Sequence, residues 1–302
     1  MAKSAAKVML ILAAILGTSV TLAAQRTFDK RIDAPAGGRL TFDADVGSVS
    51  VVGGDTSQVV VHADLEGSQS FLDRLHVSAQ QTATGVTISA QTDHTGWFDW
   101  FNIGWNRVQF TVEVPRNYPV ELRTSGGNLD VRNLNAWVHG KTSGGGIHLE
   151  GVAGNVNLHT SGGDISAERL NGPADLSTSG GNIGVTDSGG DLILRTSGGD
   201  IRIQDDDGKV DAHTSGGSIQ ARLRTNDGIN LETSGGSITL QLPQGSHASL
   251  DAETSGGDVT SNLPVTTSGT VSGDHLHGDI GGGGPSIYLR TSGGSIRIEP
   301  RS

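Results

Sequence analysis

The side chains most able to perform chemistry in this sequence are carboxylates. Asp175 and Asp211 occupy the same position of an 18-residue repeat, two repeats apart. If the repeats stack as strands, that separation is ~9.6 Å, near the range in which inverting glycoside hydrolases hold their two carboxyl groups. One hypothesis is therefore a polysaccharide-active enzyme. Both residues are expected on an outer face with nothing apolar nearby to raise a pKa, so we favour ordinary solvated charges.

Other catalytic and metal-binding patterns are missing from the sequence. It has no G-x-S-x-G, P-loop, G-x-G-x-x-G or H-E-x-x-H motif and no cysteine, and so no disulfide or thiolate ligand. His275, His277, Asp274 and Asp279 could bind a transition metal, but they lie in a glycine-rich stretch that we interpret as a polar loop. We expect no catalytic residue, no metal site and no cofactor.

A four-residue motif, Thr-Ser-Gly-Gly, dominates the second half of the chain. The first six copies follow one another every 18 residues, and the later gaps are 19, 21 and 37 residues. An internal period of this kind indicates a repeat architecture. The motifs begin at Thr124, Thr142, Thr160, Thr178, Thr196, Thr214, Thr233, Thr254 and Thr291.

Aliphatic residues flank each motif at fixed distances. In the third repeat Val156 and Leu158 precede the threonine and Ile165 follows it, with polar residues between them. This alternation with period two is typical of strands with one buried face. The Gly-Gly pair between the strands, such as Gly126 and Gly127, suits a corner because glycine adopts positive φ freely. A second glycine, twelve residues after the threonine, is expected at the other corner.

The repeat predicts an all-β fold, a parallel β-helix or β-solenoid with about 18 residues per coil. One two-stranded unit buries too little surface to fold alone, so units must stack and share a core. Ile165, Ile183 and Ile201 should then lie over one another, since a slip of one residue would turn every aliphatic side chain outward. The motif threonines face inward, and their hydroxyls are expected to bond backbone groups of the corners.

The chain divides into three predicted parts. Residues 1–24 are typical of a signal peptide: Lys3 and Lys7, nine apolar residues from Val8 to Leu16, then small residues. Residues 25–118 are expected to form an N-terminal β cap with the first irregular coils, including a short helical turn within 65–77. Residues 119–302 form the solenoid, with a glycine-rich insertion at 261–285. The apolar run is about half of a membrane span, so no transmembrane span is expected in the mature chain.

The net charge of the chain and its aromatic cluster narrow the choice of binding partners. The formal net charge is −11, which disfavours nucleic acid and anionic lipid as partners. Most aromatic residues lie close together in the cap region, and this cluster is either an apolar plug over the first coil or an exposed loop that binds a sugar, a protein or a membrane interface. The candidate binding residues of the cluster are Trp97, Phe98, Trp100, Phe101 and Trp105.

Three segments resemble a known family. They are the Trp-Phe-Asp-Trp-Phe stretch at 97–101 followed by Val-Glu-Val-Pro at 112–115, the repeat array from Thr124, and Gly-Asp-Ile-Gly-Gly-Gly-Gly-Pro at 278–285. Together they resemble the bacterial putative adhesins, exported β-strand-repeat proteins with a domain of unknown function. The resemblance covers nearly the whole mature chain. It implies a right-handed parallel β-helix at the cell envelope, and no catalytic residues.

The sequence therefore favours an exported, non-catalytic β-solenoid that presents a binding or structural surface in the periplasm, on the outer cell surface or outside the cell. An envelope protein or a glycan is the candidate partner. Two alternatives stay open. The first is the polysaccharide-active enzyme of parallel β-helix type considered above, and the second is an envelope-stress signalling component that acts through the aromatic cluster at 97–105.

Overall fold

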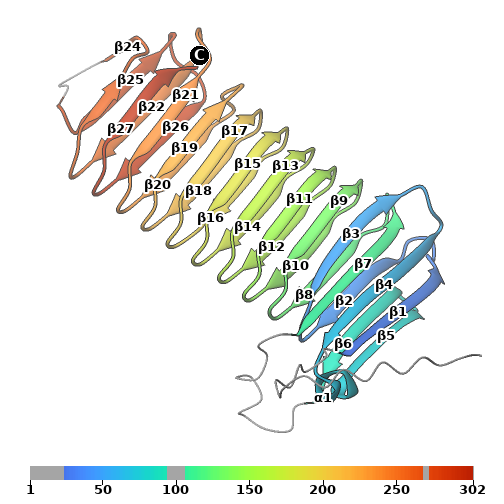
Figure 1. Cartoon of the computed structure of the whole chain (residues 1–302). Coiled ribbons are helices and arrows are strands. Elements are labelled where there is room, and N and C mark those ends of the chain that lie inside the picture. The colour runs from blue at the N-terminus through green and yellow to red at the C-terminus, as the bar shows by residue number, and fades with distance from the viewer. Residues whose placement is uncertain (1–23, 94–105, 268–271, 302) are drawn as a thin grey trace, which may run out of the picture.

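The computed structural model describes residues 24–93, 106–267 and 272–301 and shows two long β-sheets face to face (Figure 1). Sheet A has 13 strands and sheet B has 14. The chain passes from one sheet to the other at each corner, so every central coil contributes one strand to each sheet. The fold class predicted from the repeat, an all-β solenoid, is confirmed.

The central coils follow chain order along the stack. Their strands in sheet B are β8 (Val120–Thr124), β10 (Val138–Thr142), β12 (Val156–Thr160), β14 (Ala174–Thr178), β16 (Leu192–Arg195), β18 (Val210–Thr214) and β20 (Ile229–Thr233). Their strands in sheet A are β9 (Leu129–Leu134), β11 (Ile147–Val152), β13 (Ile165–Leu170), β15 (Ile183–Ser188), β17 (Ile201–Asp206), β19 (Ile219–Leu223) and β21 (Ile238–Leu242).

The core lies between the two sheets and consists of aliphatic columns. Ile165 pairs in parallel register with Ile183, and Ile183 with Ile201. All three side chains are buried, as the repeat predicts. Because equivalent residues of successive coils stack ~4.8 Å apart, the same side-chain position recurs as a row along each outer face.

The glycines of the motif are required for a different reason from the one expected. None of the motif glycines has positive φ. A Cβ atom on the second glycine would instead lie far too close to the preceding coil: at Gly181 it would be 2.1 Å from the carbonyl oxygen of Gly163. The first glycine of the same motif, Gly180, has ordinary space, with its nearest such neighbour at 3.7 Å. The corner therefore needs glycine for close backbone approach rather than for a left-handed conformation.

Positive φ occurs near the opposite corner, mostly at residues other than glycine. Asn133, Arg169, Asp187 and Asp205 have φ between 54° and 59°, and Gly151 occupies the same row with φ 64°. The repeated glycine expected at this corner, represented by Gly154, Gly172, Gly190 and Gly208, does lie between the two strands, but it has no positive φ either. A Cβ at these glycines would meet the preceding coil's backbone at 2.2–2.5 Å.

The motif threonines form a buried column of hydrogen bonds, as expected. The Thr160 hydroxyl donates to the carbonyl oxygen of Gly145 in the preceding coil at 2.7 Å and accepts from the Gly163 amide at 3.4 Å. The same pair of contacts recurs at Thr142, Thr178, Thr196, Thr214, Thr233 and Thr291. Each threonine thus fastens its corner to the coil before it.

Replacing one of these threonines tests the column. Thr160→Val keeps the shape of the side chain but leaves the Gly145 carbonyl without its donor in a fully buried position. We expect the free energy of unfolding to fall by about 1–3 kcal/mol, measured by urea denaturation. Thr160→Ser retains the hydroxyl and should lose clearly less, so an equal loss in both variants would contradict a role for the hydrogen bond.

The N-terminal end has a mixed topology. In sheet B, β2 (Arg39–Ala44) pairs in parallel with β8 on one side and with β6 (Gly85–Thr92) on the other. In sheet A, β3 (Ser48–Gly54) pairs in parallel with β9 on one side and with β7 (Arg107–Pro115) on the other. Three antiparallel strands cover the outer edges: β1 (Ala24–Asp33), β4 (Gln58–Gly67) and β5 (Leu75–Thr82). The helical turn expected within 65–77 is α1 (Gln69–Arg74), capped by Ser68.

The C-terminal end departs from chain order. The last coil, formed by β26 (Ser286–Thr291) and β27 (Ile296–Pro300), lies between the coil of β20 and β21 and the coil of β22 (Ala248–Thr254) and β23 (Val259–Ser261). β25 (His275–Ile280) pairs antiparallel with β22, and β24 (Val265–Thr266) with β25. The interpretation of 261–285 as a mere polar loop is therefore wrong, because this insertion supplies the strands that cover the last edge of sheet B.

Candidate functional site

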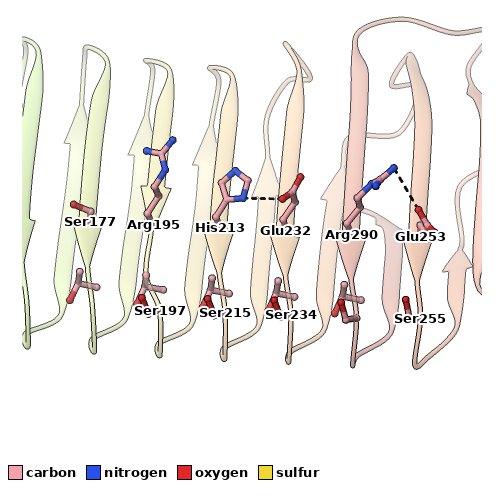
Figure 2. A pocket seen from close by; sticks show the side chains of 16 residues that line it. Ser177, Arg195, Ser197, His213, Ser215, Glu232, Ser234, Glu253, Ser255 and Arg290 are labelled. Atoms are coloured by element: carbon pink, nitrogen blue, oxygen red, sulfur yellow. Dashed lines mark ion pairs between the residues drawn. The ribbon is translucent and has the colours of Figure 1, made fainter.

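A groove of about 610 Å³ runs across six strands on the outer face of sheet B (Figure 2). Its strands, in spatial order, are β14, β16, β18, β20, β26 and β22. The motif threonines form its buried floor. Because each coil contributes the same positions, the groove is a direct product of the repeat.

One side of the groove is the row of side chains that immediately precede the motif threonines. In spatial order these are Ser177, Arg195, His213, Glu232, Arg290 and Glu253 (Figure 2). His213 Nδ1 lies 3.3 Å from Glu232, and the Arg290 guanidinium lies 3.6 Å from Glu253. The row therefore alternates in charge towards its C-terminal end and presents cationic and anionic groups in close succession.

The other side of the groove is the row of motif serines. Their side chains are exposed, and their hydroxyls make no hydrogen bond within the part of the chain that the structure describes. These hydroxyls are spaced by one coil, ~4.8 Å, and each can donate one hydrogen bond and accept others. The row consists of Ser197, Ser215, Ser234, Ser292 and Ser255.

The two carboxylates considered for hydrolysis lie next to this groove. Asp175 and Asp211 stand two coils apart in one row, as predicted, with Ile193 between them. The guanidinium of Arg195 lies 3.6 Å from Asp175 and 3.5 Å from Asp211. Since a cation occupies the space between the carboxylates, they form an exposed charge network rather than an open gap for an attacking water.

The acidic residues that follow the Gly-Gly corners accept hydrogen bonds from backbone amides of the next coil. The backbone amide of Asn182 donates to the Asp164 carboxylate of the preceding coil at 2.7 Å. The backbone amide of Asp200 donates in the same way to the side-chain oxygen of Asn182 at 2.8 Å. Asp200 in turn accepts from the Ser218 amide. Aspartate and asparagine fill this role interchangeably, so the carboxylate charge is not what the position needs.

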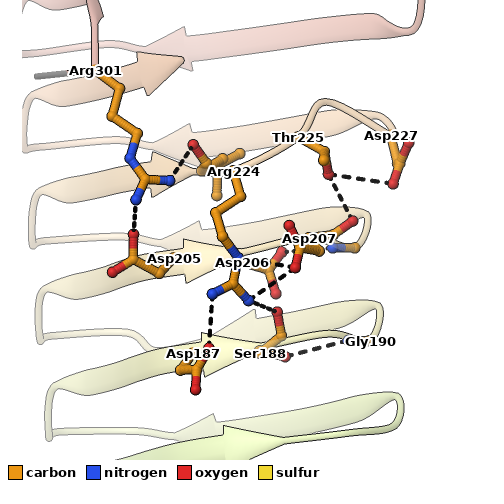
Figure 3. Close-up of polar contacts among 12 residues, drawn as sticks. Asp187, Ser188, Gly190, Asp205, Asp206, Asp207, Arg224, Thr225, Asp227 and Arg301 are labelled. Carbon is orange, nitrogen blue, oxygen red and sulfur yellow. Dashed lines mark hydrogen bonds and ion pairs between the residues drawn. The ribbon is translucent and has the colours of Figure 1, made fainter. Parts of the chain in front are cut away.

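A second cluster surrounds a buried acid at the opposite corner (Figure 3). Asp206 is 1% exposed and continues a core column that is otherwise aliphatic apart from its neighbour Ser188. Burial raises the pKa of Asp206 to about 7, although the hydrogen bonds from Ser188 and from the Gly208 amide oppose the shift. Its Oδ1 atom has no hydrogen-bond partner among the residues that the structure describes. Sequence reasoning missed this residue, although the polar break in the aliphatic column was visible.

Basic side chains surround this acid from later coils. Arg224 contacts Asp187 at 2.7 Å and Asp207 at 2.9 Å, and these two carboxylates hold the pKa of the guanidinium above its usual value. Arg301, near the C-terminal end, forms an ion pair with Asp205 (Figure 3). Asp205 and Asp207, the two neighbours of the buried acid in sequence, are thus each held by an arginine.

Several residues singled out in the sequence lie outside the described ranges or do not come together. The candidate binding residues 97–105 and the segment 1–23 belong to the part of the chain that the structure does not describe. Within the ranges that it does describe, no three His, Asp or Glu side chains are arranged to hold a metal ion. No helix in the same ranges has the length and hydropathy of a membrane span.

Comparison with solved structures returns bacterial proteins of low sequence identity. A "putative lipid binding protein" from Parabacteroides distasonis is 12% identical, with 92% of this chain and 97% of that chain aligned and a TM-score of 0.46. A "putative adhesin" from Bacteroides fragilis is also 12% identical, with the same coverage and a TM-score of 0.40. A "putative cell adhesion protein" from Clostridium sporogenes is 13% identical, covers 92% of this chain and all of its own, and has a TM-score of 0.24.

A family model gives the clearest relationship. No curated protein matches the sequence. The family model Toastrack DUF4097, in contrast, matches residues 38–299, a range that runs from β2 through the repeat array into the last coil. This match agrees with the sequence resemblance to an exported β-strand-repeat family of unknown function. The chain therefore belongs to the Toastrack DUF4097 family.

Proposed function

We propose that this protein is a non-catalytic binding protein of the cell envelope that holds its ligand in the groove on sheet B. The observation that carries the proposal is the groove itself, which combines free serine hydroxyls with a row of alternating charges over six strands. Such an arrangement offers many weak polar contacts along a rigid line, which suits an elongated ligand. We propose export through the segment 1–24, consistent with its signal-peptide composition.

The rigidity of the surface supports a display role. The groove floor is formed by buried threonines that are bonded to the preceding coil, so the side chains above it stand on a fixed backbone. A surface that is ordered before binding loses little conformational entropy when a ligand arrives. The motif serines of the groove are exposed in every coil from Ser197 to Ser255, as a site for a long polymer requires.

Replacing the groove arginines tests this proposal. The mature chain, immobilised and exposed to solubilised cell-envelope fractions of its host, should retain a component, and Arg195→Ala combined with Arg290→Ala should lower that retention by about tenfold. The matched control is Arg123→Ala with Lys141→Ala, which removes two cations from the same row on β8 and β10, outside the groove. No retention by the parent protein, or equal loss in both double variants, would overturn the proposal.

A further inference from the structure

An exposed aromatic ring adjoins the groove at its C-terminal end. Tyr288 is 46% exposed, and among the described residues it is the one large apolar side chain that the fold leaves in solvent. It precedes Arg290 by two residues on β26, where Ile287 and Leu289 face the core. Tyr288 and the groove residue Arg290 therefore stand side by side on the outer face of sheet B.

Polar side chains flank this ring on the neighbouring strands. Tyr288 pairs with Asn230 on β20 and with Asp251 on β22, and Asp251 pairs on its other side with the exposed His277 of β25. The Asp251 side chain is 24% exposed; its buried Oδ1 atom has no hydrogen-bond partner among the described residues, and His275 Nε2 lies 4.0 Å from it. A partly exposed carboxylate thus lies between the Tyr288 and His277 rings.

We propose that the ligand of the groove is a glycan, one sugar of which lies against the Tyr288 ring while Asp251 and Asn230 bond its hydroxyls. An exposed ring offers its face to the apolar C–H side of a sugar, and the polar groups beside it bond the hydroxyls at the edge. The sugar chain then continues along the groove, where the serine hydroxyls provide one donor and acceptor per coil. This inference rests on the proposed groove function.

The charges of the groove favour a neutral sugar chain over a polyanion. Arg195 and Arg290 alternate with Glu232 and Glu253, so cationic and anionic groups are balanced along the row. A polyanion would meet repulsion at both glutamates, whereas neutral hydroxyls can accept from the arginines and donate to the carboxylates. The six strands span ~24 Å, which accommodates an oligosaccharide of several units.

Binding of the mature chain to an array of linear neutral and acidic oligosaccharides, up to six units long, tests the inference. We expect binding to at least one neutral oligosaccharide, stronger for longer chains, and a loss of about tenfold in affinity for Tyr288→Ala. Tyr288→Trp keeps a ring and should retain binding. His139→Ala is the matched control, because it removes an exposed ring from the same row on β10, outside the groove.

The outcomes separate this inference from the proposed function. Binding to no oligosaccharide, or equal affinity of Tyr288→Ala and the parent protein, overturns the glycan assignment. Envelope fractions treated with periodate, which oxidises sugars, should lose retention, and protease-treated fractions should keep it. If protease alone abolishes an arginine-dependent retention, the ligand is a protein, so the glycan inference fails while the groove function stands.

Discussion

Gly181→Ala is expected to destabilise the solenoid severely, whereas Gly180→Ala in the same motif is expected to be tolerated. A methyl group on Gly181 would lie 2.1 Å from the carbonyl oxygen of Gly163 and 2.5 Å from its carbonyl carbon. Both atoms belong to the backbone of the preceding coil, so no flexible side chain can move aside. Relief requires the two coils to separate, and we expect the free energy of unfolding to fall by about 3 kcal/mol or more.

The neighbouring glycine provides the control for this prediction. At Gly180 the nearest atom to an added methyl group is the carbonyl oxygen of Ser161 at 3.7 Å, which is an ordinary contact, and φ is not positive. Gly180→Ala should therefore change stability by less than about 1 kcal/mol, since it restricts the unfolded chain without straining the folded one. Urea denaturation of both variants measures the difference, and similar losses in the two would show that close coil approach is not the reason for the second glycine.

Asp206→Asn is expected to abolish a pH dependence of stability that the parent protein shows between about pH 4 and pH 7. Burial raises the pKa of Asp206 from 3.8 to about 7, so the folded state binds a proton that the unfolded state has lost in that range. Stability is therefore greatest below the unfolded pKa, falls as pH rises, and levels off above about pH 7. The shift corresponds to a loss of about 4 kcal/mol.

The matched control is Asp200→Asn on the same coil. Asp200 accepts the Ser218 amide at an exposed corner, and Asn182 performs the same task one coil earlier. This variant should keep the pH dependence of the parent, while Asp206→Asn should lose it and be more stable than the parent at pH 8. Thermal or urea unfolding at pH 4, 6 and 8 provides the measurement, and parallel curves for the parent and Asp206→Asn would refute the assignment.

The regular part of the fold was predictable because equal spacing determines register. Once Ile165, Ile183 and Ile201 recur every 18 residues with period-two alternation, only one stacking places them all inside. The reason for glycine at the corners was not predictable, since it depends on how closely Gly181 approaches the coil before it. That distance is a property of the assembled stack and not of any single repeat.

The candidate site was predictable only in part. The rows that line the groove follow from the repeat, but Glu232, Arg290 and Glu253 become neighbours because the last coil lies between two earlier ones. The gap of 37 residues before Thr291 indicates an insertion without saying where the chain returns. Tyr288 could not be assigned to the groove for the same reason, because its flanking residues come from non-adjacent segments.

The position of the last coil also determines how the protein resists mechanical tension. In a stack built strictly in chain order, force on the C-terminus detaches one coil at a time. Here the last coil pairs with a neighbour on both sides: β26 lies between β20 and β22, and β27 lies between β21 and β23. The Arg301 amide adds a bond to the Leu242 carbonyl. Detaching this coil by its C-terminal end must therefore break two strand interfaces in each sheet at once.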